Sequence, residues 1–93
     1  MNADLLAANI EANVPLVYVR YSRHWYTRAG GKWVRISGDA WVKTLLLAMA
    51  VEPGRSDLER AELRSYALAN GVSARLRRLV AYDMAPHDAG FAR

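Results

Sequence analysis

Arginine and aromatic side chains alternate through residues 17–36, and these residue types bind phosphate groups and stack on nucleic-acid bases. The candidate binding residues are Tyr18, Arg20, Arg23, Tyr26, Arg28, Lys32, Trp33, Arg35 and Lys43. Arginine, tyrosine and tryptophan are also enriched at the energetic centres of protein–protein interfaces. The segment therefore predicts a surface that binds either nucleic acid or an acidic protein.

A glycine pair at residues 30–31 predicts a two-residue hairpin turn, because both central positions of a type I′ turn need a positive φ. Pairing across this turn places Arg28 opposite Trp33 and Tyr26 opposite Arg35. Such pairs also occur on an ordinary solvated sheet face, where each stabilises by roughly 0.2–1 kcal/mol. Both interpretations of the hairpin face stay open at this point.

A preceding strand at residues 16–21, joined by the three-residue loop Ser22 to His24, divides the strand residues between two faces. The expected binding face holds Tyr18, Arg20, Tyr26, Arg28, Trp33 and Arg35. The expected core face holds Val17, Val19, Tyr21, Trp25, Thr27, Val34 and Ile36. One face of the predicted sheet is thus basic and aromatic, and the other is mostly apolar.

Charge is distributed unevenly along the chain, which has a formal net charge of +4. Between Val17 and Lys43 the only acidic residue is Asp39, whereas acidic residues gather near the N-terminus and at residues 57–62. A second basic patch is expected from Arg75, Arg77 and Arg78. One side of the molecule should therefore be positive and attract an anionic partner at long range.

Several kinds of chemistry find no support in the residues. Cysteine is absent, which excludes disulfides, thiolate metal sites and cysteine nucleophiles, and His24 and His87 lie far apart. Lys32 follows its glycines at the start of a strand, whereas a phosphate-binding loop needs that lysine at the start of a helix. Acidic residues at 57–62 suit helix capping better than acid–base catalysis. We expect no enzyme activity, no metal and no cofactor.

The predicted elements form one α+β domain over residues 1–93. A three-stranded antiparallel meander, at about residues 15–36, is flanked by one N-terminal helix and three C-terminal helices. Asn2 can cap the first helix, which should end near Asn13 before Pro15. The second helix should begin at Ser37 or Asp39 and end near Val51.

Two further helices are predicted after residues 53–54, a Pro-Gly pair. Ser56 and Glu59 have capping-box spacing and should open the third helix, which the pair at residues 70–71 should end. Ser73 should cap a fourth helix that reaches about Asp83, with Met84 turned inward. We expect residues 86–93 to be a mobile tail. No apolar run is long enough to cross a membrane and no secretory signal is visible, so a cytoplasmic location is expected.

Residues 20–21, 24–27 and 30–34, with the helix at 42–49, resemble the small accessory domain that precedes the helicase in phage, plasmid and poxvirus-type primase-helicases. The segment 69–80 is similar to the short helices that follow in that family. The resemblance implies a stand-alone version of a mobile-element replication domain that contacts nucleic acid or a nucleic-acid-handling complex. This chain has no phosphate loop of the associated ATPase, so no catalytic residue is transferred.

Three functions follow as hypotheses. The first is a phage-encoded inhibitor or adaptor, such as an anti-CRISPR protein, that docks its basic-aromatic face on a nucleic-acid-processing protein complex. The second is a module that binds single-stranded nucleic acid, in which the cations contact phosphates and the rings stack on bases. The third is a structural subunit that oligomerises through the aromatic face. We expect the protein to be a monomer or a homodimer.

Overall fold

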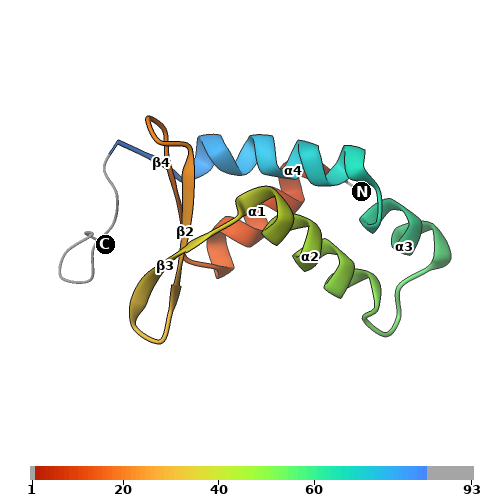
Figure 1. Ribbon diagram of the computed structural model, residues 1–93. Coiled ribbons are helices and arrows are strands. Elements are labelled where there is room, and N and C mark those ends of the chain that lie inside the picture. Colours follow the sequence, from red (N-terminus) through yellow and green to blue (C-terminus); the bar gives the residue numbers. More distant parts are fainter. Residues whose placement is uncertain (1, 84–93) are drawn as a thin grey trace.

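A computed structural model describes residues 2–83, which form an α+β fold with one N-terminal helix, a small mixed sheet and three further helices. The elements are α1 (Ala3–Asn13), β1 (Leu16–Val19), β2 (His24–Ala29), β3 (Lys32–Ile36), α2 (Gly38–Ala50), α3 (Asp57–Leu63), α4 (Tyr66–Leu79) and β4 (Ala81–Tyr82). All the helices lie on one side of the sheet (Figure 1). The predicted fold class is confirmed. The expected tail, with His87, and the expected inward Met84 lie outside the described residues.

The β2–β3 hairpin has the predicted turn and register. Gly30 and Gly31 have φ values of 58° and 79°, which glycine adopts without a steric penalty. Arg28 lies opposite Trp33 and Tyr26 lies opposite Arg35. The local turn chemistry is therefore sufficient to set the pairing of these two strands.

The connection between β1 and β2 differs from the predicted three-residue loop. Val19 pairs with His24, so four residues, 20–23, form the link, and the Arg23 N–H closes it by donating to the Val19 carbonyl at 2.8 Å. Tyr18 consequently lies opposite Trp25, whereas the predicted loop placed Tyr21 there. The observed register differs from the predicted one by three residues. Because three is an odd number and side chains alternate between faces, every β1 side chain lies on the face opposite to the predicted one.

The predicted faces of β1 are therefore wrong. Tyr18 shares a face with Trp25, toward the helices, while Val17 and Val19 share a face with Tyr26. Both valines are fully buried, although they do not belong to the helical core cluster. We call the sheet face that points away from the helices the outer face. Tyr21, expected in the core, is 76% exposed in the β1–β2 link.

A fourth strand that the sequence pattern did not indicate completes the sheet. β4 pairs with β1 in parallel, which gives the strand order β3-β2-β1-β4. It has two residues and directly follows α4. A segment this short has no detectable alternation, and only its position beside β1 makes it a strand.

The helix boundaries are correct where a local cap sets them. Asn2 caps α1 by accepting from the Asp4 and Leu5 N–H groups, and Ser56 with Glu59 forms the predicted capping box of α3. The break between α3 and α4, however, lies near Ser65, whose hydroxyl accepts from the Leu68 N–H. The predicted break at residues 70–71 is wrong.

Gly71 lies inside α4, on the side that faces α1. A β-carbon at this position would lie 3.5 Å from the Ala3 β-carbon and 3.3 Å from Nη1 of Arg75. α1 and α4 pack against each other, and a β-carbon here would make ordinary van der Waals contact with α1. Glycine is tolerated inside helices as well as found just after them, so residues 70–71 alone do not mark a helix end.

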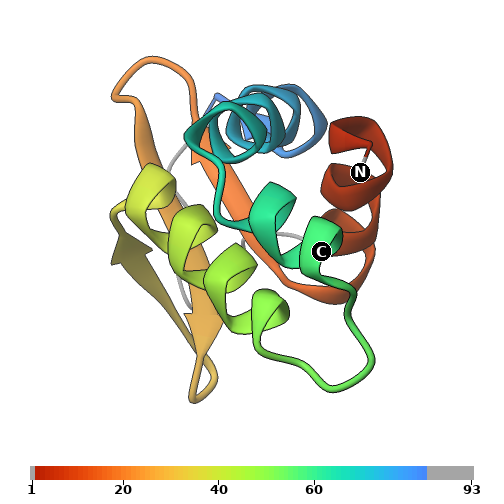
Figure 2. The same cartoon turned by 90° about the vertical axis from the view of Figure 1, so that its right-hand side faces the viewer.

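The core lies between the sheet and the helices, with α4 packed against both α1 and α2. Figure 2 shows these helices over one face of the sheet. The fully buried side chains of this cluster include Val42 and Leu46 of α2, Leu63 of α3 and Leu76 of α4. Trp25 is the sheet's largest contribution and is only 5% exposed. Within residues 2–83, no helix has the length and apolar character needed to span a membrane.

Candidate functional site

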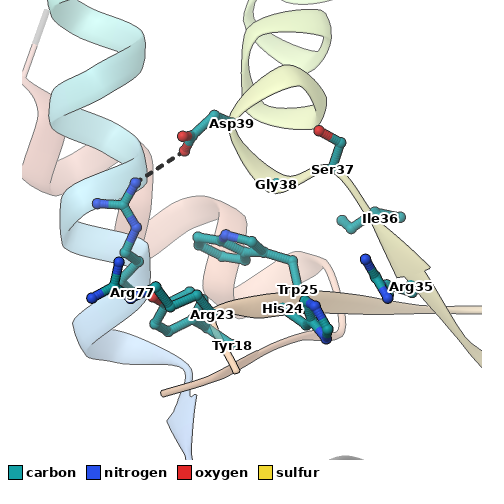
Figure 3. Close-up of a pocket in the computed structure, with 10 residues that line it drawn as sticks. All are labelled: Tyr18, Arg23, His24, Trp25, Arg35, Ile36, Ser37, Gly38, Asp39 and Arg77. Atoms are coloured by element: carbon teal, nitrogen blue, oxygen red, sulfur yellow. Dashed lines mark hydrogen bonds and ion pairs between the residues drawn. The ribbon is translucent and has the colours of Figure 1, made fainter. Parts of the chain in front are cut away.

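A cavity of about 760 Å³ opens where the hairpin meets the first turn of α2 (Figure 3). We call it the arginine pocket. It is lined by Tyr18, Arg23, His24, Trp25, Arg35, Ile36, Ser37, Gly38, Asp39 and Arg77. These residues come from β1, the β1–β2 link, β2, β3, the start of α2 and α4. The pocket therefore depends on contacts between segments that are distant in sequence.

Trp25 anchors the pocket, because its indole packs directly against the first residue of α2. A β-carbon at Gly38 would overlap the indole ring, so only glycine permits this approach. Ile36 and Tyr18 complete the apolar part, and the Tyr18 ring lies 4.9 Å from that of Trp25. The buried indole fixes the start of α2 at the end of β3 and thereby sets the pocket's shape.

Arginine side chains dominate the polar lining. In Figure 3, Arg77 and Asp39 lie on one side of Trp25, with His24 and Arg35 on the other. The Arg77 guanidinium donates to the Asp39 carboxylate at 3.1 Å. Arg23 has a φ of 59°, an uncommon conformation for a residue with a side chain. The pocket also includes the α2 N-terminus, whose first-turn N–H groups favour anions.

Four exposed cations follow the β2–β3 hairpin from its turn to the pocket, and we call this set the cationic ribbon. It consists of Arg23, Arg28, Lys32 and Arg35. None of them forms an ion pair with a carboxylate among residues 2–83. Arg28 instead donates to the Gly31 carbonyl at 3.0 Å and lies 5.6 Å from the centre of the Trp33 ring. Their positive charges remain available to an anionic partner.

The other predicted binding residues of the sheet divide into two groups. Tyr26 and Trp33 are half-buried on the outer face, the face that also carries Arg28 and Arg35. Tyr18 lies on the helix-facing side, and Arg20 lies in the β1–β2 link, paired with Asp83 at 3.1 Å. The predicted placement of Tyr18 and Arg20 on the binding face is wrong, because the β1 offset moves them away from it.

Lys43 points toward α4 and not toward the hairpin. Its ammonium donates to the Arg64 carbonyl at 2.6 Å and lies 3.9 Å from the centre of the Tyr66 ring. These contacts join α2 to the α3–α4 connection and occupy the lysine locally. The structure thus separates Lys43 from the cationic ribbon.

The three arginines of the expected second basic patch lie in three different environments and do not form one patch. Arg75 pairs with Asp4 of α1, and Arg77 pairs with Asp39 in the arginine pocket. Arg78 is exposed on α4 and has neither contact. Helix geometry separates these neighbours in sequence, because adjacent residues on a helix point in different directions.

Sequence reasoning missed part of the pocket lining, namely His24 and the start of α2. Ser37 and Asp39 were identified only as possible helix caps. In the structure, the Ser37 hydroxyl makes no capping hydrogen bond, and Asp39 binds Arg77. A polar Ser-Gly-Asp run directly after a basic strand is the signal that could have indicated this site.

Among the described residues, no group of three or more histidine or acidic side chains is placed to hold a metal ion. The chemistry of the arginine pocket and the cationic ribbon is instead that of anion binding, with guanidinium groups whose planar donors match phosphate or carboxylate oxygens. Comparison of the chain with protein-family models, curated proteins and solved structures finds no match.

Proposed function

We propose that this protein is a non-enzymatic module that binds single-stranded nucleic acid through phosphate contacts with the cationic ribbon. One observation carries the proposal. Among residues 2–83, the four cations of the ribbon have no carboxylate partner and lie along one hairpin. Arg20, Arg55, Arg60, Arg75 and Arg77 are in ion pairs, and the other cations without one, Lys43, Arg64 and Arg78, lie apart on the helices or at their ends. A row of uncompensated cations attracts a polyanion more than it stabilises the fold.

The geometry of the hairpin supports a linear ligand. A strand of five or six residues spans about 17–20 Å, so the ribbon offers cations along an extended path rather than at one point. Lys32, next to the turn, lies on the opposite face of the hairpin from Arg28 and Arg35. Arg28 and Arg35 lie on the same face, in neighbouring cross-strand rows. Tyr26 lies on that face opposite Arg35 and adds an aromatic surface for a base. The resemblance to a primase-helicase accessory domain is consistent with this function and stays a prediction.

The test is fluorescence anisotropy of an oligothymidine with hydroxyl ends and an internal fluorophore, over a salt series. Four phosphate contacts predict that log K falls with log salt at a slope of about −3 for a single strand. Arg35→Gln should weaken binding and reduce the steepness by about 0.7. Arg78→Gln is the matched control, because Arg78 is exposed but lies outside the ribbon. Absence of binding at low salt would contradict the proposal, and stronger binding to duplex would contradict its single-strand part.

A second function, an inhibitor or adaptor that docks on an acidic surface of a nucleic-acid-handling complex, is favoured by a different observation. Tyr21 is 76% exposed in the basic β1–β2 link, between Arg20 and Arg23, and an exposed tyrosine near arginines is typical of interface anchors. This function predicts inhibition of a purified nucleic-acid-processing complex that Tyr21→Ala relieves, without binding to the oligonucleotides above. Inhibition unchanged in Tyr21→Ala would contradict it.

A further inference from the structure

We infer that the arginine pocket receives the terminal phosphate monoester of a single strand, so that the protein prefers phosphorylated strand ends to internal positions. The inference rests on the proposed function, because the same strand would follow the cationic ribbon. It adds a class of ligand, a strand end with a phosphate group, and a place for that group. Three properties of the pocket lead to it.

The first property is charge. Arg23, Arg35 and Arg77 contribute three positive charges and Asp39 one negative charge, which leaves a net charge of +2 in the pocket lining. A phosphate monoester carries about −1.5 to −2 at pH 7, as phosphorylated side chains do. An internal phosphodiester carries a single negative charge. The lining as a whole, with Arg77 on one side of Trp25 and Arg35 on the other, therefore matches the charge of a terminal phosphate better than that of an internal one.

The second property is position. Arg23 and Arg35 belong to both the ribbon and the pocket, so the path along the hairpin continues into the cavity. Figure 3 shows α4 and the first turn of α2 beside the cavity, at the end of this path. A strand that follows the ribbon from the hairpin turn meets these helices. The cavity, of about 760 Å³, is in the size range of sites for one small ligand, about 300–1,000 Å³.

The third property is the set of donors. Arg35 and Arg23 have no carboxylate partner among the described residues, and Arg77 contacts Asp39 through a single nitrogen. Guanidinium groups donate in a planar fork that fits two oxygens of one phosphate. The uncapped α2 N-terminus adds backbone N–H groups beside them. Among the described residues of the pocket lining, Asp39 is the only acidic group, and it would oppose the phosphate.

The experiment compares three oligothymidines of one length, with the fluorophore at the centre of each: one with a 5′-phosphate, one with a 3′-phosphate and one with hydroxyl ends. We expect one phosphorylated end to bind about tenfold more tightly than the hydroxyl-ended strand, the gain expected from an added charged contact. The two phosphorylated arms identify which end enters the pocket. Arg77→Gln should reduce the preference to less than about threefold, and Arg78→Gln should keep it.

A second variant tests the charge argument in the opposite direction. Asp39→Asn removes the negative group that the described part of the chain places in the lining, and it should increase the preference for the phosphorylated end. A reduced or unchanged preference in this variant, with an unchanged thermal melting curve, would contradict the inference. A preference that persists in Arg77→Gln would show that the phosphate binds elsewhere.

The two proposals fail in distinguishable ways. Equal affinity for all three oligonucleotides, with the expected salt dependence, would overturn the terminal-phosphate inference and leave the ribbon function in place. No measurable binding of any of the three would overturn both. Thermal melting of each variant verifies that the losses do not come from unfolding.

Discussion

Arginines of the cationic ribbon and arginines of the helical layer differ in what their side chains contact. Arg55, Arg60 and Arg75 of the helical layer are half-buried, and each pairs with a carboxylate. Arg23, Arg28 and Arg35 of the ribbon are exposed and pair with none among residues 2–83. One chain thus uses the same residue type in two ways. Of these helical-layer arginines, Arg60 and Arg75 link helices and Arg55 makes local pairs, whereas the hairpin arginines leave a positive field for a partner.

The positions of the acidic residues in the sequence explain why the helical arginines are paired and the hairpin arginines are not. Asp39 is the only carboxylate between residues 17 and 43, and it is committed to Arg77. Around α3, by contrast, Asp57 and Glu59 lie three or four residues from the arginines they pair with. Such helical spacing makes ion pairs easy to form. The hairpin has no comparable supply of acids, so its cations stay uncompensated.

The largest predicted effect concerns Trp25, where the hairpin is anchored on the helical layer. Trp25→Ala should lower the free energy of unfolding by about 3–5 kcal/mol, because it empties a site that is 5% exposed in the core. Trp33→Ala, on the outer face of the same hairpin, should lower the free energy of unfolding by a smaller amount, since Trp33 is half-buried. Chemical denaturation followed by circular dichroism measures both. Equal losses would mean that the hairpin faces are assigned incorrectly.

A smaller effect is expected at the contact between Trp25 and the start of α2. Gly38→Ala should destabilise by about 1–3 kcal/mol, because the added methyl group overlaps the indole and α2 must shift. The shift should also disturb the arginine pocket and weaken anion binding. Gly54→Ala provides a control with open space, where only its φ of 86° matters. A neutral result at residue 38 in thermal melting would contradict the close packing.

The contrast between the two sets of arginines can be tested directly. Arg75→Gln breaks the pair with Asp4 and should lower the free energy of unfolding by about 0.2–1 kcal/mol without changing oligonucleotide affinity. Arg35→Gln should do the reverse, weakening binding and leaving stability within about 0.5 kcal/mol. Denaturation and anisotropy on both variants separate the two roles. If both variants changed both properties equally, the distinction between the regions would not hold.

The smallest predicted effect on stability is electrostatic and concerns Glu59 in the capping box of α3. The Ser56 backbone N–H, with a smaller contribution from Arg55, holds the pKa of the Glu59 carboxyl below its ordinary value of 4.5. A lowered pKa means that ionised Glu59 stabilises the fold above that ordinary value and loses this contribution as pH falls through the folded pKa.

Glu59→Gln retains a capping side chain but removes the charge. Its melting temperature should therefore be below that of the unmodified protein at pH 7, and the difference should disappear in the acid range below pH 4.5. Thermal melts of both proteins from neutral to acid pH measure this. A difference that grows toward acid pH would contradict the capping interaction. Oligonucleotide binding should be unaffected, because Glu59 lies in α3.

The parts of the fold that sequence alone determined are those set by local chemistry. Gly30 and Gly31 are sufficient for the hairpin turn and for the pairing of Arg28 with Trp33, because the turn fixes the register of its own strands. The Asn2 cap and the Ser56–Glu59 box act within a few residues and mark helix starts correctly. The uneven distribution of charge, and with it the cationic ribbon, is also visible in the sequence.

Only the tertiary structure decided which face the β1 residues occupy, where α4 begins and which residues meet in the arginine pocket. The face of Tyr18 depends on an offset that a four-residue link permits, and the start of α4 after Ser65 places Gly71 inside that helix. Asp39 and Arg77 meet although 38 residues separate them. Contacts of this kind form when the sheet and helices bury a shared core. Turn residues, helix caps and hydrophobic spacing do not predict how these elements pack against each other.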